Sequence, residues 1–523
     1  MMISAQSVLK KVTFPFLLFL TITVLLLIIT IQLINLTIYD ETLYLAHMKL
    51  VMQGKIPYHD FFDWVPPVWL YLYAGVFSVF GENIVVARIF STILGIGSIG
   101  LVFRLAWKLS GHWTALIALA IIASVYPVTV ELTRFYYTSS AFFYVILAIS
   151  IDMAFPRKIY SAVVVEILFT LATGTVQAFG LLILLYPTYL FFVCKEKKNA
   201  IISLGFGLIL GGLIAAPFLL IDYQATIWAM FSYSKEVIPL RWDYTWKTYL
   251  AYIGRTFLAY PLIWFPINYL IIKSIWQWFL DKNIKIRFNK TQPKAFFLLW
   301  IAFFGIAFAV LLFNPTMFMQ QHVYYLPIGC VLVADFFVKW IRTLNNNRQI
   351  AASFTLIICF AFSLLFSKSN FINSIQVVLL SQQEENLDRV ISTTKYLTRD
   401  IPGAKVFSFV PYFGIEAGKT IFPGTEYGIS SFTLNWSEEK ASRYKFFTGS
   451  QATSWIATSQ PDLIVMVDKT WRTMSCCGPK NGVVFLDQLN AIIPRYYTLV
   501  DSFKVNEYWG EARFYKRKIL SGS

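Results

Sequence analysis

Long apolar runs are the feature of this sequence that most restricts its fold. About eleven stretches of roughly 17–25 residues contain almost no charged side chain, and an α-helix of that length crosses the hydrocarbon core of a membrane. Only 14% of all residues are charged, against about 25% in soluble domains. The approximate positions of the stretches are 14–36, 84–108, 113–130, 137–155, 159–173, 175–194, 200–221, 250–272, 295–313, 322–340 and 350–367. We therefore predict a polytopic α-helical membrane protein.

The hydropathy falls after residue 368, which predicts a boundary between a transmembrane domain, 1–368, and a soluble domain, 369–523. The second part contains one helical pattern, two strand-like runs and a final pair of alternating segments, as expected for a small α/β domain. These segments are 384–399, 404–410, 461–468, 496–505 and 512–519.

The net charge of +16 is concentrated in loops that share one side of the membrane with the N-terminus. With the N-terminal residues, these loops hold 18 Lys and Arg and 2 acidic residues; the loops of the opposite side hold 7 basic and 9 acidic residues. This asymmetry follows the positive-inside rule and argues against a nucleic-acid partner. It places the N-terminus in the cytoplasm and the soluble domain outside it, in a multi-pass protein of the plasma (inner) membrane. The loops on the N-terminal side are 104–112, 156–158, 195–198, 273–294 and 339–348.

The external segment 38–83 is acidic although it lies at the predicted membrane surface. It contains the adjacent pair Asp40-Glu41, and Asp60 and Asp63 shortly before Pro66-Pro67. Carboxylates next to a bilayer are costly and often functional. Helical spacing predicts an amphipathic surface helix over 41–53, ended by Gly54, and a second helix over 68–80.

Two interpretations of these acidic residues remain open. In the functional one, Asp40 is a general base supported by Glu41, and Asp63 is a carboxylate that returns to the same pocket. In the structural one, Asp40 is an N-cap with Glu41 in the first helical turn, and Asp63 caps the helix that follows Pro66-Pro67. Asp60 has the same two interpretations.

Several basic and aromatic residues on the external side are candidates for binding an anionic group. Arg88 could pair with the acidic residues or with an anionic ligand, or its side chain could extend to the interface. His322 and Tyr325, with Tyr324, could hold a phosphate or belong to an ordinary aromatic belt. Arg241 is a further phosphate candidate in the loop before the span at 250–272.

Other polar features lie inside apolar stretches. Glu166 and Asp335 have no lysine or arginine directly beside them, so each could be a functional acid or a helix–helix hydrogen-bonding group. Gly95, Gly97 and Gly100 spell GxGxxG, but no strand precedes them, which favours close packing of helices over a dinucleotide site. No ligand pattern demands a metal or another cofactor, although the acidic pair could bind a divalent ion.

Residues 38–90 resemble the C-type glycosyltransferase superfamily, and most closely its family-39-like branch, which includes protein O-mannosyltransferases and aminoarabinose transferases. The matching residues are Asp40-Glu41, Gly54-Lys55-Ile56-Pro57-Tyr58, Phe61-Phe62-Asp63 before Pro66-Pro67, Tyr71-Leu72, Phe80-Gly81 and Ala87-Arg88. A weaker match is Tyr324-Tyr325-Leu326-Pro327, and the resemblance covers roughly residues 14–367.

The resemblance implies an inverting transfer of a sugar from a polyprenyl-phosphate donor to an acceptor outside the cytoplasm. By position, Asp40 would be the base, Glu41 and Asp63 would orient or assist it, and Arg88 would support the acidic loop or the phosphate. The acceptor could be a protein, a glycolipid or a polysaccharide, and membrane lipid surrounds the enzyme.

The sequence departs from the family at two places. Val65 stands where relatives often carry Lys or His, so the cation for the phosphate would come from Lys55, Arg241 or His322. His59 and Asp60 are further candidates for substrate binding. The second external loop lacks the aspartate of some relatives, and Glu131 would be its substitute.

Two other classes of function compete with a transferase. A transporter or flippase would often show internal repeats with paired broken helices, which this sequence lacks. A scaffolding protein would leave the acidic segment without a use. Loss of activity in Asp40→Asn at unchanged expression would favour the transferase.

Overall fold

The computed structural model describes residues 38–236 apart from 125 and 157, then 293–313, 323–344 and 382–518 with several gaps, and the single residues 22, 266 and 269. These residues form two compact units, each built from separate stretches of the chain. The first unit includes 87–214 and 247–376, and the second combines 36–86 and 215–246 with the C-terminal residues 377–523. The predicted boundary at 368/369 lies outside the described residues and stays a prediction.

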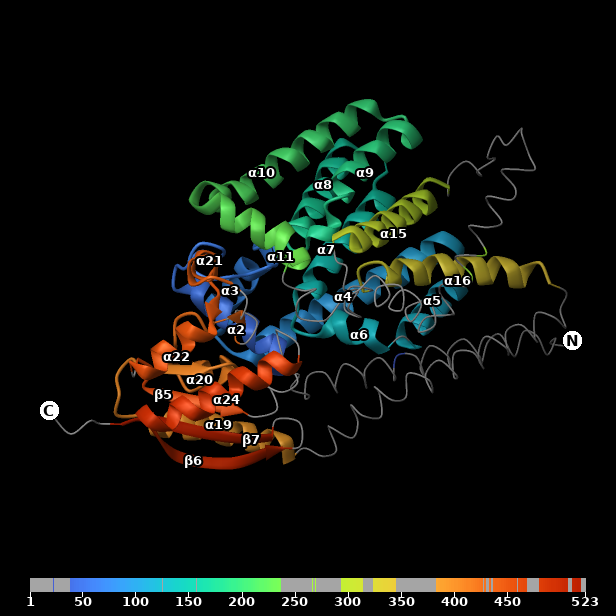
Figure 1. Ribbon diagram of the computed structural model, residues 1–523. Helices are drawn as coiled ribbons and strands as arrows, with labels where there is room; N and C mark the ends of the chain where they lie inside the picture. Colours follow the sequence, from blue (N-terminus) through green and yellow to red (C-terminus); the bar gives the residue numbers. More distant parts are fainter. Residues whose placement is uncertain are drawn as a thin grey trace, which may run out of the picture. The chain divides into compact units, whose positions relative to one another are not determined.

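The first unit is helical (Figure 1). The length and apolar composition of its helices indicate an integral, multi-pass membrane protein. Four described helical stretches are long and apolar enough to cross a membrane: Ile84–Ser110, Tyr137–Ala154, Gln177–Cys194 and Lys197–Ser232. The helices of this part are α4 (Ile84–Ser110), α5 (His112–Ser124), α6 (Tyr126–Thr133), α7 (Tyr137–Ala154), α8 (Ile159–Thr173), η1 (Gln177–Phe179), α9 (Leu182–Tyr189), η2 (Leu190–Cys194), α10 (Lys197–Ile227), α15 (Pro293–Phe313) and α16 (Leu326–Arg342).

Most predicted spans that fall on described residues agree with these helices, and two need correction. The stretch 113–130 is divided into α5 and α6, because Pro127 has no backbone N–H and is tolerated only in the first turn of a helix. The stretch 200–221 continues to Ile227 through a kink at Asp222, whose φ and ψ are −147° and 81°. The predicted spans 14–36, 250–272 and 350–367 lie outside the described ranges, apart from single residues, so the count of eleven stays a prediction.

Glu166 and Asp335, two buried acids of this unit, differ in their surroundings. Ser110 donates to Asp335, and Lys339, one helical turn further along α16, pairs with Asp335 at 2.7 Å. Asp335 therefore joins two helices, and the expectation that it has no basic neighbour was wrong. The carboxyl oxygens of Glu166 are buried without a hydrogen-bond partner among the described residues. The hydrogen-bonding interpretation is thus confirmed for Asp335, and for Glu166 it stays a prediction.

Two glycines of the GxGxxG sequence allow helices to approach closely, as expected for small residues in membrane helices. A Cβ atom on Gly95 would lie 2.4 Å from the carbonyl oxygen of Leu132, and one on Gly97 would lie 3.0 Å from the ring of Phe143. Gly100 has no atom within 4 Å of such a Cβ, so the packing explanation holds for two of the three glycines.

Gly95→Ala is expected to destabilise the first unit by about 1–3 kcal/mol, because the new methyl group would collide with backbone. Gly100→Ala on the same helix is the matched control and should be neutral or stabilising by up to about 1 kcal/mol. The measurement is the fraction of detergent-solubilised protein that stays monodisperse after heating. Equal heat resistance of the two variants would contradict the close approach of α4 to residue 132.

The second unit contains the external segment and the C-terminal sheet. Its helix α3 (Val68–Phe80) has the predicted bounds, whereas α2 (Ile38–Met52) begins three residues before the predicted start at residue 41. α2 ends at Met52, and Gly54 in the turn after it adopts a φ of +81°, a conformation that costs glycine little. The second unit also contains residues 215–236, which form the end of α10, η3 (Trp228–Ser232) and α11 (Tyr233–Glu236).

The C-terminal residues form a mixed sheet with helices, as predicted. The five strands have the order β2-β1-β5-β7-β6, with β1 parallel to β2 and β5, and β7 antiparallel to β5 and β6. The strands are β1 (Lys405–Ser408), β2 (Thr420–Ile421), β5 (Leu463–Val467), β6 (Tyr497–Asn506) and β7 (Gly510–Arg517), and a separate parallel pair is β3 (Phe432–Thr433) and β4 (Phe447–Thr448). The helices are α19 (Gln382–Leu397), α20 (Tyr412–Glu416), α21 (Glu438–Arg443), α22 (Gly449–Ala457) and α24 (Pro479–Tyr496).

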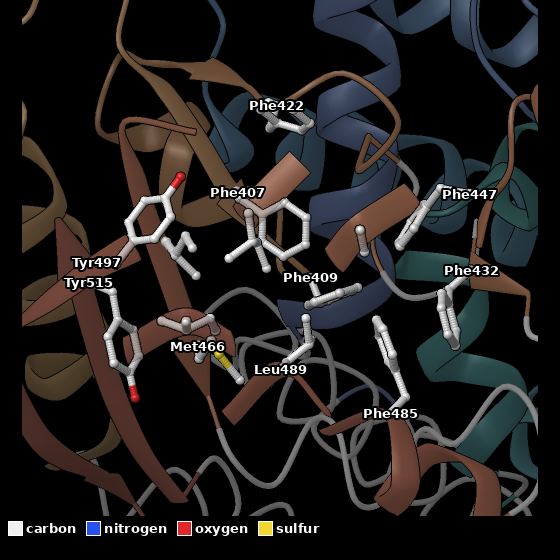
Figure 2. Packing of buried hydrophobic residues seen from close by; sticks show 14 residues of the cluster. Phe407, Phe409, Phe422, Phe432, Phe447, Met466, Phe485, Leu489, Tyr497 and Tyr515 are labelled. Atoms are coloured by element: carbon white, nitrogen blue, oxygen red, sulfur yellow. The ribbon is translucent and has the colours of Figure 1, made fainter. Parts of the chain in front are cut away.

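Aromatic side chains fill the core of this α/β region (Figure 2). Phe407 and Phe409 meet edge to face with ring centroids 5.2 Å apart, and Phe432 stacks on Phe485 of α24 at 4.2 Å. Such pairs add stabilisation beyond the burial of their area. The core therefore gives the C-terminal region a rigid framework.

Candidate active site

The centre of the candidate site is a buried pair between α2 and the segment that leads to α3. His47 of α2 donates from Nδ1 to Oδ2 of Asp63 at 2.9 Å, and neither side chain is exposed to solvent. Oδ1 of Asp63 accepts from the backbone N–H of Val65 at 2.9 Å. Asp63 is therefore fixed from two directions, and it forms a turn before Pro66-Pro67 instead of capping α3, whose N-cap is Pro67.

The turn around Asp63 is held by Tyr58. Tyr58 has a φ of 70°, its N–H donates to the carbonyl of Phe61 at 2.8 Å, and its hydroxyl donates to the carbonyl of Val65 at 2.8 Å. Burial, and secondly the nearby charge of Asp63, raise the pKa of the Tyr58 phenol well above its ordinary value of 10.0. The hydroxyl thus remains a hydrogen-bond donor, and it keeps residues 58–65 in one conformation.

α2 carries the predicted base, Asp40, as well as His47 of this pair. Asp40 lies in the first described turn of α2, so the expectation that it is an N-cap was wrong. Positions 40 and 47 are seven residues apart, which places them on one face of the helix, two turns from each other. Glu41 is 2% exposed. Sequence reasoning missed His47, although its spacing from Asp40 was a usable signal.

The remaining acids and bases of the external segment are more exposed. Asp60 accepts from the N–H of Ile56 at 2.7 Å, and His59 lies 3.9 Å from Asp222, the kinked residue of α10. Lys55 is exposed, and Lys49 pairs with Glu82 at 3.3 Å. Lys55 and His59 are therefore accessible for an anionic ligand, whereas Asp63 is not.

An aromatic cluster joins three segments of this unit that are far apart in sequence. Phe62, beside Asp63, contacts Phe446 with ring centroids 4.7 Å apart and Tyr233 at 4.8 Å. Trp228 of η3 stacks on Tyr444 at 4.2 Å. We refer to this group as the aromatic cluster; its buried members are Tyr58, Phe62, Phe218, Ala225, Trp228, Ala229, Tyr233, Ala441 and Phe446. It anchors the acidic segment to the end of α10 and to residues 436–446.

Other predicted site residues lie in the first unit or outside the described ranges. Arg88 of α4 is 4% exposed, and Tyr325, at the start of α16, is 2% exposed and packs against Phe303. Glu131 is also nearly buried and pairs with Arg134 at 3.4 Å, while the Arg134 guanidinium lies 5.3 Å from the centre of the Tyr136 ring. Arg241 and His322 are outside the described residues. Among the described residues, no group of three or more His, Cys, Asp or Glu side chains could hold a metal ion.

Comparison with solved structures shows the fold. The crystal structure of ArnT from Cupriavidus metallidurans bound to undecaprenyl phosphate is 13% identical, with a TM-score of 0.52 over 97% of this chain and 99% of that chain. The same protein in the apo state gives 13% identity, a TM-score of 0.53 and the same coverage. An oligosaccharyltransferase from Archaeoglobus fulgidus in the apo form is 13% identical over 96% of this chain and 75% of that chain, with a TM-score of 0.47.

No protein-family model and no curated protein matches the sequence. The chain nevertheless has the fold of ArnT over nearly its whole length, with apolar membrane-length helices followed by a mixed α/β region. This confirms the resemblance to the C-type glycosyltransferase superfamily, at the level of the fold.

Proposed function

We propose that this protein transfers a sugar from a polyprenyl-phosphate donor to an acceptor on the extracytoplasmic side of the membrane, with inversion at the anomeric carbon. The observation that carries the proposal is the return of Asp63 to α2, where it meets His47 two turns from Asp40. The shared fold with ArnT supports it, because that protein was solved with undecaprenyl phosphate bound. A lipid-borne donor suits an enzyme that works where nucleotide sugars are not available.

In this mechanism, Asp40 takes the proton of an acceptor hydroxyl as that oxygen attacks the anomeric carbon. The bond between the anomeric carbon and the phosphate oxygen breaks, and polyprenyl phosphate leaves with the electron pair. Glu41 and Asp63 orient the acidic segment, and the buried His47–Asp63 pair keeps α2 in register with the turn at 58–65.

The negative charge that develops on the leaving phosphate needs cations near the headgroup plane. Lys55 and His59 are exposed on the external segment and are our first candidates, since Val65 supplies no charge. Arg88, Arg241, His322 and Tyr325 are further candidates for the donor phosphate, and Asp60 for the substrate. Glu131, paired with Arg134, would take the place of the acid that relatives carry in the second external loop.

The proposal includes the orientation of the chain. The protein would reside in the plasma (inner) membrane with its N-terminus in the cytoplasm. The acidic segment and the C-terminal region would lie outside the cytoplasm. The acceptor is a protein, a glycolipid or a polysaccharide, and the sugar is a hexose or a pentose.

The test is transfer by purified, detergent-solubilised protein from a panel of radiolabelled polyprenyl-phosphate sugars. Asp40→Asn should lower transfer at least about 100-fold, because an amide cannot accept the proton. Glu82→Gln, which removes an exposed acid of the same segment, is the matched control and should stay within about threefold.

Equal turnover by wild type and Asp40→Asn would remove Asp40 from the mechanism. No transfer or donor hydrolysis by folded wild type with any donor would overturn the proposed reaction. Flux of lipid-linked or small solutes into liposomes would then be measured as the mark of a transporter.

A further inference from the structure

The C-terminal region touches α2 at a defined place. Within the second unit, α20 packs on α2 (Figure 1), and Gly428 lies against Leu43. A Cβ atom built on Gly428 would lie 3.1 Å from Cδ2 of Leu43 and 2.5 Å from the carbonyl oxygen of Phe409. An alanine at position 428 would therefore force the backbone at Phe409 to shift, and it would press on the Leu43 side chain of α2, which would have to move by a few tenths of an ångström.

Leu43 lies between Asp40 and His47 on α2. It is three residues after Asp40 and four before His47, which is the spacing of neighbours on one helical face. Leu43 is also 4% exposed, so it cannot turn away into solvent without losing its burial. The contact with Gly428 thus falls on the helical turn between the proposed base and the His47–Asp63 pair.

Gly428 is held firmly on the side of the sheet. It has a φ of +57°, and its N–H donates to the carbonyl of Thr425 at 2.9 Å. Thr425 donates from Oγ1 to the carbonyl of Phe422 at 2.7 Å, and Phe422 belongs to the aromatic core of the α/β region. Hydrogen bonds therefore connect Gly428, through Thr425 and Phe422, to that core.

Charge also matches across this contact. Burial raises the pKa of Glu416 of α20, and the positive charge of Lys49 on α2 opposes that rise. The charge of Lys55, just after α2, acts in the same direction on the pKa of Glu426 in the turn 422–428. Burial raises the pKa of Glu426 from its ordinary value of 4.5 to about 7, and Lys55 opposes that rise. Glu426 also accepts from the N–H of Gly424 at 2.7 Å, which orders the turn.

We propose that Gly428, held by Thr425 and Phe422, is a positioning element that fixes the position of the Asp40 turn of α2. This inference rests on the proposed function, since it concerns the same site. Gly428 is not a catalytic residue; it acts through Leu43. The C-terminal region would thus be part of the machinery of transfer and not merely an appended domain.

Gly428→Ala is the test variant, and Gly418→Ala is its matched control. Gly418 has a φ of +69° in the same region, but a Cβ atom there would have no neighbour within 4 Å. Both substitutions carry the strain of a left-handed alanine, and only Gly428→Ala adds the collision. A displacement of catalytic groups by about 1 Å can lower turnover about 100-fold.

Two readouts separate positioning from a general loss of structure. In Gly428→Ala we expect kcat to fall about tenfold or more with a donor KM within about twofold of wild type. Amide hydrogen exchange of residues 38–52 should become faster, while that of β5 in the sheet core stays at the wild-type rate. Gly418→Ala should leave both the turnover and the exchange of 38–52 unchanged.

A second variant tests the same contact in case Gly428→Ala fails to fold. Leu43→Ala loosens the same contact from the side of α2 and should raise exchange at 38–52 without altering β5. Unchanged exchange of 38–52 in both variants would overturn the positioning role, whatever the turnover of wild type. If wild type itself transfers no sugar while exchange responds as expected, the proposed function fails and the contact stands.

Discussion

Asp63→Asn is expected to lower sugar transfer at least about 100-fold, because it removes the charge that His47 and the Val65 N–H hold in place. The carboxylate is fully buried, so no solvent charge can replace it. Asparagine is nearly isosteric and can still accept from Val65, which keeps the local backbone close to its wild-type conformation. The measurement is kcat and KM for the donor in purified protein.

Glu82→Gln is the control for this prediction as well, since Glu82 is an exposed acid of the same segment that pairs with Lys49 at 3.3 Å. It should retain turnover within about threefold. Folding of each variant is followed by size-exclusion chromatography in detergent. Full turnover by folded Asp63→Asn would show that the buried pair has no part in transfer.

Trp228→Ala is expected to destabilise the second unit by about 3–5 kcal/mol, the cost of removing a large buried aromatic side chain. Trp228 is 6% exposed and contacts rings from both other segments of the aromatic cluster, including Tyr444 at 4.2 Å and Phe62 at 6.0 Å. Its loss should release residues 436–446 from the acidic segment. Limited proteolysis within 436–446 should therefore become faster, and transfer should fall with it.

Trp107→Ala is the matched control for the aromatic cluster. Trp107 is 54% exposed on α4 and pairs with Phe103, a neighbour on its own helix. Its replacement should cost less than about 1 kcal/mol and leave proteolysis of 436–446 unchanged. Similar proteolysis of the two variants would argue that the cluster does not join these segments.

The helices were the part of the fold that sequence reasoning predicted best. The second helix of the external segment, 68–80, and the helix 159–173 have the bounds that the pattern predicted. Apolar length decides such elements locally, because each backbone N–H in a membrane must be satisfied within its own helix. The final hairpin was also predictable, since its alternation and its turn lie close together in sequence.

Contacts between distant segments could not be predicted in the same way. Lys339 lies four residues after Asp335, which is the spacing of a helical pair. The positions directly beside Asp335 hold no basic residue, so the sequence reasoning assigned it no basic partner. Nothing in the sequence near Phe62 indicates that Tyr233 and Phe446 lie beside it, because such pairings depend on how the chain returns through some 170 and 380 residues. The position of a glycine such as Gly428 against Leu43 has no local signature at all.

The sequence by itself determined a membrane protein with an acidic segment after its first apolar stretch, because apolar length and carboxylates near a bilayer are local properties with large energetic consequences. It also determined the superfamily resemblance, through the spacing of Asp40-Glu41, Asp63 and Pro66-Pro67. Only the tertiary structure decided that Asp63 is buried against His47 and that the C-terminal region packs on the turn of α2 between Asp40 and His47. These contacts arise from packing between segments far apart in the chain, where the gain in free energy depends on three-dimensional fit and not on any local pattern.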